Sequence, residues 1–242
     1  MKIICSDYDG TLNHGGITPE KLDAIRKWQE KGNLFCVVSG RQKEFFFELQ
    51  KNRIPVDYLL ACNGALITDK DYNIVSDIRC NEDIGNELTE YIFSLGCPFT
   101  YFCGDGFLRI RNKDFPEEQG IDYDGRKLLS FNQISTACFS FDEAAAVTKS
   151  IREKFGDFLN PLQNGTCIDI VPVGMDKAQG IYKLLSLVGG KKEDVIAVGD
   201  NVNDEAMIKE FYSYAMENGV ESIKAMADRK IKSITQLIER EI

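Results

Sequence analysis

The stretch from Ile3 to Thr11 reads I-I-C-S-D-Y-D-G-T and decides the predicted fold. Its apolar start predicts a short buried strand. The strand ends in two carboxylates, Asp7 and Asp9, and Gly10 then permits a sharp turn of the chain. Because alternate side chains of an extended segment point to the same side, we expect both carboxylates on one side of the chain.

This acidic pair is a candidate magnesium site. Two carboxylates about 4 Å apart repel each other by roughly 4 kcal/mol at an effective dielectric constant of about 20. A shared proton or a bound cation would offset that repulsion, and Mg²⁺ prefers oxygen ligands. The alternative is a solvated Asx turn that closes the strand, which a D-x-D-G string also forms.

The composition predicts a globular protein with a substantial core in one or two domains, since 43% of the 242 residues are hydrophobic and 28% are charged. A net charge of -9 without a basic stripe disfavours a nucleic-acid partner.

We expect neither a signal peptide nor a membrane-spanning segment. The eight cysteines form no C-x-x-C pair and mostly lie in apolar runs, which indicates buried thiols in a reducing, cytoplasmic compartment.

His14 is the only histidine of the sequence and lies in a glycine-rich loop. A single histidine excludes zinc sites rich in histidine, and it excludes Ser-His-Asp and Cys-His catalysis unless His14 itself takes part. A histidine in such a loop is more commonly solvated. General acid–base catalysis is therefore expected from carboxylates or lysine.

The N-terminal part alternates buried strands with helices. The first strand is followed by a predicted helix, strand, helix and strand at 19–31, 34–38, 42–52 and 58–61. This order predicts parallel strands joined by right-handed crossovers. Ligands gather at the carboxyl ends of such strands, and Asp7, Ser39 and Asn63 fall there.

The pattern changes in the middle of the sequence, where helices alternate with pairs of strands. The expected elements are a hairpin at 65–76, a helix at 83–95, strands at 99–103 and 107–111, a polar loop at 113–129, a strand at 136–141, a helix at 142–155 with Asp142 as its N-cap, and strands at 158–161 and 167–171. We predict an inserted α+β domain at 81–174 and an α/β core made of 1–80 and 175–242. The alternative is one irregular α/β domain.

The C-terminal part returns to single buried strands and helices. The expected elements are a helix at 176–188, strands at 194–198 and 212–216, and helices at 205–211, 220–227 and 233–242. A buried strand here opens into G-D-N-V-N-D, which contains Asp200 and Asp204. If this strand lies beside the first, three or four carboxylates meet at one sheet edge, which favours a hard divalent cation. The alternative is that Asn203 or Asp204 caps the following helix.

Two more polar residues are candidates for binding an anion. Lys177 lies near a predicted helix start, where its charge would be directed at a phosphate. The alternative is an ordinary surface lysine. In either case we expect Lys177 outside the core. Ser39 and the next backbone N–H would bind a phosphoryl oxygen, or its hydroxyl caps the following helix.

Four motifs, D-Y-D-G-T, V-V-S-G-R, D-K-A-Q-G and G-D-N-V-N-D, occur in the order typical of the haloacid dehalogenase-like phosphatases. The chain most resembles the Cof-type branch, in which a cap domain lies between the second and third motifs. The resemblance covers the predicted core throughout and the cap by position and strand–helix order. It implies a Rossmann-like parallel-sheet core with an inserted smaller α+β cap, and a Mg²⁺-dependent hydrolase of small phosphorylated metabolites such as sugar phosphates.

The resemblance also implies catalytic and metal-binding roles. Asp7 would attack phosphorus and form an aspartyl-phosphate, for which a carboxylate is a competent nucleophile. Asp9 would protonate the leaving alkoxide and then deprotonate the hydrolytic water. Asp7, Asp200 and the backbone carbonyl of Asp9 would bind Mg²⁺, and Asp204 would orient Lys177.

A second group of residues would hold the phosphoryl oxygens, as the same resemblance implies. These are Ser39, Lys177, Asn203 and the backbone N–H groups of Tyr8 and Gly40. Such a site agrees with phosphoryl transfer, which needs charge neutralisation and alignment more than strong bases.

The predicted cap offers substrate contacts on one face of its sheet. Leu108 and Ile110 share one face of a strand, and Arg109 and Arg111 share the other. If helices cover the apolar face, both arginines and Asp169 lie on the open face, where an arginine would bind the leaving group. The alternative is that these are ordinary solvated positions.

Two other classes of function are compatible with parts of this pattern. A phosphomutase or phosphotransferase would use the same motifs. A receiver-type signalling module also combines a phosphorylated Asp with acidic neighbours, Lys and Ser/Thr, but such modules are single domains of about half this length. A dinucleotide or P-loop site is excluded, because neither glycine-rich motif occurs. The oligomeric state and the substrate are not predicted.

Overall fold

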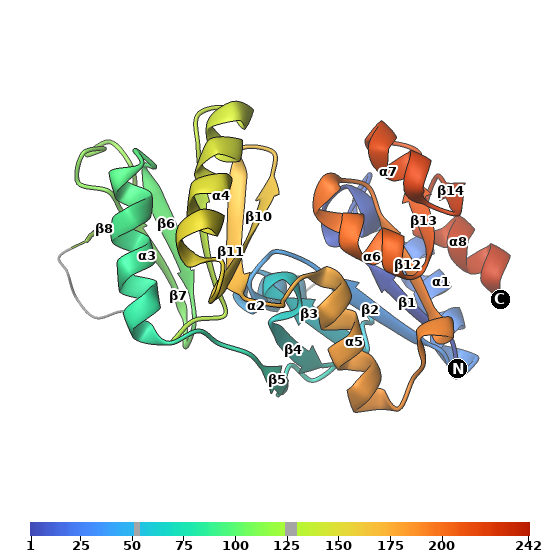
Figure 1. Ribbon diagram of the computed structural model, residues 1–242. Helices are drawn as coiled ribbons and strands as arrows, with labels where there is room; N and C mark the ends of the chain where they lie inside the picture. The colour runs from blue at the N-terminus through green and yellow to red at the C-terminus, as the bar shows by residue number, and fades with distance from the viewer. Residues whose placement is uncertain (51–53, 124–129) are drawn as a thin grey trace. The chain divides into compact units, whose positions relative to one another are not determined.

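β1 (Ile3–Ser6) lies in the middle of a mainly parallel sheet to which both ends of the chain contribute. The computed structural model describes residues 1–50, 54–123 and 130–242. The other strands of this sheet are β2 (Leu34–Val38), β3 (Tyr58–Ala61), β4 (Leu66–Asp69), β5 (Ile74–Asp77), β12 (Val195–Gly199), β13 (Tyr212–Met216) and β14 (Arg229–Ile231). Within the described residues the strand order is β14-β13-β12-β1-β2-β3-β4-β5, with parallel pairs from β14 to β3 (Figure 1).

Parallel pairing brings three segments that are distant in sequence to one edge of the sheet. β1 pairs with β2 on one side and with β12 on the other. The register aligns Ser6, the last residue of β1, with Val198 of β12. The loops that begin near Asp7, Ser39 and Asp200 therefore start at the carboxyl ends of adjacent strands, where ligands collect in such sheets.

Helices cover both faces of this sheet. They are α1 (Pro19–Glu30), α2 (Lys43–Gln50), α5 (Lys177–Val188), α6 (Glu205–Glu210), α7 (Glu221–Met226) and α8 (Ile234–Glu241). Residues of α1, α2 and α8 share one buried cluster with Ile4 and Phe35 of the strands. Residues of α5, α6 and α7 share a second cluster with Ile3 and Cys36. Because both faces are buried, the central strands are continuous apolar runs.

The chain divides into two compact units, residues 1–76 with 177–242, and residues 77–176. The second unit contains α3 (Glu82–Ser94), α4 (Phe141–Phe155), β6 (Phe99–Cys103), β7 (Phe107–Arg111), β8 (Ile121–Asp122), β9 (Gln133–Ala137), β10 (Leu159–Asn164) and β11 (Cys167–Pro172). Its strands follow the order β10-β11-β9-β6-β7-β8. This unit is an α+β fold, mainly antiparallel, in contrast to the parallel sheet of the first unit.

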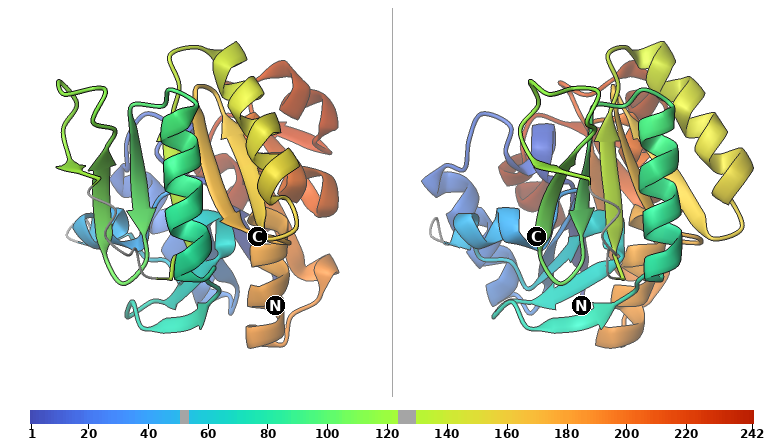
Figure 2. Two further views of the ribbon diagram at one scale, coloured as in Figure 1. Left: turned by 60° about the vertical axis from the view of Figure 1, so that its left-hand side comes forward. Right: turned by 90° about the vertical axis from the view of Figure 1, so that its left-hand side faces the viewer.

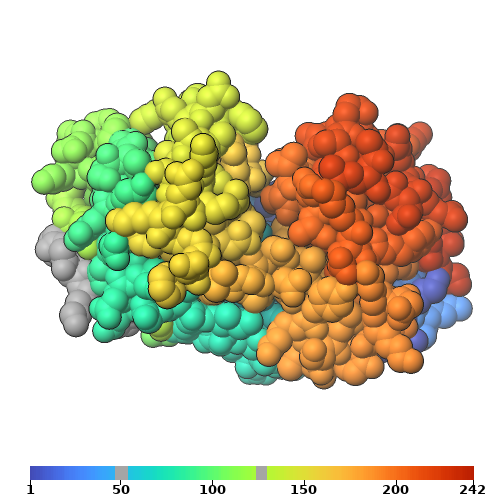
Figure 3. Space-filling model, in the orientation of Figure 1, coloured from blue at the N-terminus to red at the C-terminus, as the bar shows by residue number. Residues whose placement is uncertain are grey.

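In the second unit, α3 and α4 lie on the same face of the sheet (Figures 1 and 2). Leu88 of α3 and Ile151 of α4 share a buried cluster with Ile110, Ile134 and Ile168 of the strands. The other side of α4 forms part of the outer surface of this unit (Figure 3). The alternation along the strands therefore separates an apolar, helix-covered face from a more polar one.

Some boundaries differ from the sequence predictions. The strand expected at 136–141 is β9, which ends at Ala137. Asp142 is not the N-cap of α4: the Ser140 hydroxyl accepts the backbone N–H of Glu143 at 3.2 Å, so the helix begins one residue earlier. β14 was not predicted, and β8 interrupts the expected loop at 113–129.

Parts of two predicted segments lie outside the described residues: the end of the helix at 42–52, and residues 124–129 of the polar loop. Across the residues that are described, no helix is long and apolar enough to span a membrane.

Candidate active site

Asp7 follows β1 directly and is held by the backbone on both sides. Its N–H donates to the carbonyl of Val198 at 2.9 Å, and its own carbonyl accepts the N–H of Leu12 at 3.2 Å. The first bond continues the pairing of β1 with β12, and the second closes the turn after the strand. The Asp7 side chain is only 6% exposed, so its carboxylate lies in an almost water-free environment.

Gly10 makes room for a carboxylate from the neighbouring loop. Its φ of 78° lies in the left-handed region that favours glycine. A Cβ at this position would overlap the carboxylate of Asp200. The hydroxyl of Thr11 donates to Oδ1 of Asp200 at 2.7 Å. The loop after β1 is therefore shaped to receive the side chain of Asp200.

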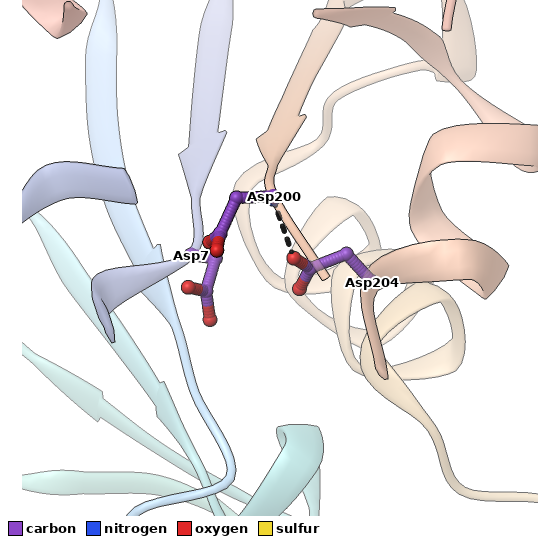
Figure 4. Close-up of side chains that lie close together, drawn as sticks. All are labelled: Asp7, Asp200 and Asp204. Carbon is purple, nitrogen blue, oxygen red and sulfur yellow. Dashed lines mark hydrogen bonds between the residues drawn. The ribbon is translucent and has the colours of Figure 1, made fainter. Parts of the chain in front are cut away.

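Asp204 organises the loop after β12. Its Oδ2 accepts the backbone N–H of Asp200 at 2.9 Å and that of Asn201 at 3.1 Å. A Cβ on Gly199 would overlap the Asp204 side chain, so glycine is required at the end of the strand. Asp204 thus supports its own loop through its side chain, and Figure 4 shows it beside Asp7 and Asp200.

Lys177, the first residue of α5, joins the two acidic loops. Its Nζ lies 2.6 Å from Oδ1 of Asp7 and 2.5 Å from Oδ1 of Asp204. The side chain is 0% exposed, so the expectation that it lies outside the core is wrong. Gly180 lets the first turn of α5 pack closely against the loop after β3. A Cβ at this position would lie only 2.6 Å from Cα of Gly64.

The buried charges of this cluster do not balance, because three carboxylates face one ammonium. Burial, and next the repulsion from Asp204, raise the pKa of Asp7 to about 8, and Lys177 offsets this only in part. Burial also raises the pKa of Asp200. Burial alone would lower the pKa of Lys177, but Asp204 and Asp7 outweigh it and raise that pKa. Without a further cation, burial and the neighbouring carboxylates therefore favour the protonated form of Asp7.

The cluster has the donor set of a hard cation site. One carboxylate oxygen from each of Asp7, Asp200 and Asp204 lies within 4.8 Å of the others. Asp204 already uses one oxygen for Lys177 and the other for backbone N–H groups. Asp7 and Asp200 remain as side-chain ligands, and the excess negative charge with oxygen donors fits Mg²⁺.

Asp9 has a partner that sequence reasoning missed. Its carboxylate forms a bidentate pair with Arg41, with Nε to Oδ2 at 2.5 Å and Nη2 to Oδ1 at 3.0 Å. The guanidinium lies over the ring of Phe45, 3.9 Å from its centroid. The motif V-V-S-G-R contains Arg41, but its pattern does not indicate which carboxylate the arginine binds. Asp9 is about half exposed, in contrast to the buried Asp7.

The other predicted phosphate-binding residues lie in the loops after β1, β2 and β12. Ser39 is 2% exposed, and its hydroxyl accepts the backbone N–H two residues later at 3.2 Å. The ring of Tyr8 packs in the core, 5.2 Å from that of Phe46, so only its backbone is suited to an anion. Gly40 and Asn203 are partly exposed.

In the second unit, Arg109 and Arg111 both have acidic partners. Arg109 lies over the ring of Phe99 at 4.1 Å, and its Nη2 lies 2.6 Å from Glu118. Arg111 pairs with Asp122 at 2.5 Å. Both arginines thus hold the segment after β7 against the sheet, and neither is an ordinary solvated side chain.

Asp169, the third polar residue predicted on that face, also has hydrogen-bond partners. Its Oδ1 accepts the hydroxyl of Ser135 at 2.7 Å and the amide of Gln133 at 3.2 Å. The neighbouring residues Ile168 and Ile170 belong to the cluster under the helices. Strand alternation therefore places Asp169 on the face opposite the helices.

Comparisons with known proteins agree with this geometry. A family model of haloacid dehalogenase-like hydrolases matches residues 4–236. The chain belongs to this family. Among its relatives, the 5-amino-6-(5-phospho-D-ribitylamino)uracil phosphatase YwtE of Bacillus subtilis is 25% identical over 270 residues, which cover 96% of this chain and 93% of that protein. The hydrolase is also 34% identical over 253 residues to the phosphatase YbjI of Escherichia coli, named for the same compound, with 94% and 89% covered.

A solved structure supports the fold independently. A haloacid dehalogenase-like hydrolase from B. subtilis superposes on the protein with a TM-score of 0.84 and 18% sequence identity, and 100% of each chain is covered. The predicted α/β class with a core of parallel strands is confirmed. Membership in a hydrolase family also removes the receiver-type signalling module as an interpretation.

Proposed function

We propose that this hydrolase is a Mg²⁺-dependent phosphatase of small phosphorylated metabolites that works through an aspartyl-phosphate. The observation that carries the proposal is the buried carboxylate of Asp7 at the end of the central strand, with Lys177 at 2.6 Å and Asp200 in the adjacent loop. A carboxylate held in this way is a nucleophile aligned for phosphoryl transfer.

In the first step, the Asp7 carboxylate attacks phosphorus, and the bond between phosphorus and the leaving oxygen breaks. Asp9 gives its proton to that oxygen, so an alcohol leaves and Asp7 carries the phosphoryl group. Lys177, Ser39 and the backbone N–H groups near the strand ends stabilise the charge on the phosphoryl oxygens. Arg41 donates to both oxygens of Asp9 in the structure, so Asp9 must first leave Arg41 and take up a proton from solvent.

In the second step, Asp9 takes a proton from water, and the water oxygen attacks the aspartyl-phosphate. The phosphorus–Asp7 bond breaks, inorganic phosphate leaves, and both carboxylates return to their starting states. Asn203, which is predicted to contact the phosphate, lies in the same loop as Asp200. Asp204 keeps Lys177 in place throughout through the contact at 2.5 Å.

Asp7, Asp200 and the backbone carbonyl of Asp9 would hold the Mg²⁺. When bound, the ion supplies the positive charge that the cluster lacks and lets a dianionic phosphate approach the carboxylates. This fits the raised pKa of Asp7, because a cation there would replace the proton that Asp7 otherwise holds.

The substrate is proposed to be a sugar phosphate or a similar small monoester. The phosphorylated ribitylaminouracil named for two relatives belongs to this chemical class, so it is among the first compounds to test. That Arg109 and Arg111 bind the leaving group is also a proposal. It requires an arginine to exchange its present acidic partner for the substrate. The cytoplasmic location stays a prediction from the sequence.

The test is phosphate release from a panel of phosphorylated metabolites, measured with Mg²⁺ and again with excess chelator. Wild-type protein should release phosphate from at least one sugar phosphate or related monoester, lose this activity with chelator and regain it on adding Mg²⁺. Full activity in chelator would contradict the metal requirement, and inactivity on every monoester would contradict the phosphatase proposal.

A further inference from the structure

Lys21 in the first turn of α1 has an unusual set of partners. Its side chain is nearly buried, with the residue 6% exposed. Its Nζ donates to the carbonyl oxygens of Leu12 at 3.0 Å, His14 at 2.5 Å and Gly16 at 2.8 Å. An ammonium has three N–H bonds, and all three are used on backbone carbonyls. Among the described carboxylates, none lies within ion-pair distance of Lys21.

The loop is curved around this ammonium. Gly15 and Gly16 have φ values of 69° and 85°, both in the left-handed region. A Cβ at either position would meet no other atom within 4 Å. These glycines therefore serve the backbone conformation, which turns the carbonyls of alternate residues inward. The carbonyl oxygens of Leu12, His14 and Gly16 thus form a carbonyl cage, a donor set of the type that binds cations. The ammonium of Lys21 occupies this cage.

The carbonyl cage is attached directly to the candidate nucleophile. The carbonyl of Leu12 accepts from Lys21, and the N–H of the same residue donates to the carbonyl of Asp7 at 3.2 Å. The preceding residue, Thr11, donates its hydroxyl to Asp200 at 2.7 Å. A shift of this loop would thus disturb the backbone that carries Asp7 and the hydrogen bond that holds the carboxylate of Asp200.

We propose that Lys21 is a positioning residue, a tethered cation whose carbonyl cage holds the turn that carries Asp7 and Asp9. Without the ammonium, three carbonyl oxygens would converge on one point and repel each other, and the loop would open. A free cation of ammonium size would then take the empty position. The effect on catalysis rests on the proposed phosphatase function, whereas the binding of a cation by the carbonyl cage does not.

The test uses Lys21→Met, which keeps an unbranched apolar side chain but lacks the terminal ammonium. We would measure kcat, KM and Tm at equal concentrations of ammonium chloride and tetramethylammonium chloride, with Mg²⁺ present. In tetramethylammonium, kcat should fall about 10- to 100-fold, as misplacement of reacting groups does, with little change in KM. Ammonium should restore most of the lost kcat and raise Tm, because it fits the carbonyl cage and tetramethylammonium does not.

The matched control is Lys27→Met, which removes an exposed lysine from the same helix. It should respond equally to the two salts. Unchanged activity of folded Lys21→Met, or the same loss in both salts, would overturn the proposal. If Lys21→Met does not fold in tetramethylammonium, the yield of folded protein in ammonium is measured instead. The proposal predicts that the variant folds in ammonium. Failure in both salts makes Lys21 a purely structural residue and overturns its positioning role.

The wild-type protein is assayed in parallel so that the two proposals can be separated. If the wild type released no phosphate, the proposed function would fail. The difference in Tm of Lys21→Met between the two salts would then still decide whether the carbonyl cage binds a cation.

Discussion

Three aspartates of the site have the same side chain but different surroundings. Asp204 is bound by Lys177 and by two backbone N–H groups. Asp200 is held by the hydroxyl of Thr11. Asp7 shares the ammonium of Lys177 with Asp204, and burial raises its pKa to about 8. Asp204 therefore supports its loop, and the same residue type is proposed to act as a metal ligand at Asp200 and as a nucleophile at Asp7.

The raised pKa of Asp7 predicts how stability depends on pH without metal. The pKa rises from an ordinary 3.8 to about 8 on folding, so the folded protein keeps a proton that the unfolded chain has lost. The free energy of unfolding should therefore fall as the pH rises from about 4 to about 8. Asp7→Asn lacks this titration, so its Tm relative to wild type in chelator should increase across that range. Parallel pH profiles of the two proteins would contradict the raised pKa.

Lys177→Met should reduce both activity and stability. Loss of the ammonium leaves Asp7 and Asp204 buried without their cation, and breaking a buried pair in this way costs about 3–5 kcal/mol. A lysine outside the core, as expected from the sequence, would affect rate more than stability; because Lys177 is completely buried, its loss should also reduce stability. Urea unfolding at neutral pH measures the loss, with Lys183→Met, an exposed lysine of α5, as the control. A loss as small as that of the control would refute the burial argument.

At the scale of elements, the strand–loop units around the site could be predicted from the sequence. A continuous apolar run followed by Asp, with a Gly nearby, indicates both a buried strand and the polar residues at its end, as at Asp7 and Asp200. The N-cap of α4 was wrongly predicted as Asp142, because Ser140 and Asp142 are both capping residue types and only the path of the chain decides between them. The pairing of Arg41 with Asp9 is a contact between loops, which no local pattern contains.

Gly10→Ala tests the fit between the two loops of the site. Gly10 and Gly32 both have a φ of 78°, so alanine costs roughly 1–2 kcal/mol of backbone strain at either position. Only at Gly10 would the new Cβ also displace the carboxylate of Asp200. Gly10→Ala should therefore need more Mg²⁺ for half-maximal activity, whereas Gly32→Ala should not. An equal Mg²⁺ requirement in both variants would contradict the close approach of these loops.

At the scale of the whole molecule, the two units have separate hydrophobic clusters, two in the first unit and one in the second among the described residues, and each unit has its own part in the proposed function. The first unit contains all the residues proposed for the chemistry and the four motifs except Asp176, the first residue of D-K-A-Q-G, which belongs to the second unit. The second contains Arg109 and Arg111, which are proposed to bind the leaving group. The sequence predicted a change from an α/β pattern to an inserted α+β domain at 81–174. It did not predict that both arginines would already be paired, since Glu118 and Asp122 lie in a segment without a regular pattern.

The proposed role of the second unit predicts an effect that depends on the substrate. Arg109→Ala or Arg111→Ala should lower kcat/KM for the best metabolite by about 1–3 kcal/mol, the usual worth of a charged hydrogen bond. Hydrolysis of a small aryl phosphate should hardly change, because its leaving group offers nothing for an arginine to bind. Arg152→Ala, which removes a guanidinium bonded to the carbonyl of Pro161 at 2.9 Å, is the control. Equal losses on both substrates, or none on either, would refute this role.

The most direct measurement is acid-quenched labelling of the enzyme during turnover. Wild-type protein is mixed with Mg²⁺ and a substrate that carries a radioactive phosphoryl group, quenched in acid and digested, and the labelled peptide is identified. We predict label on Asp7, the same label in the control Asp71→Asn, and neither label nor turnover in folded Asp7→Asn. Phosphate release by folded Asp7→Asn at the wild-type rate, or label on a residue other than Asp7, would contradict the proposed nucleophile.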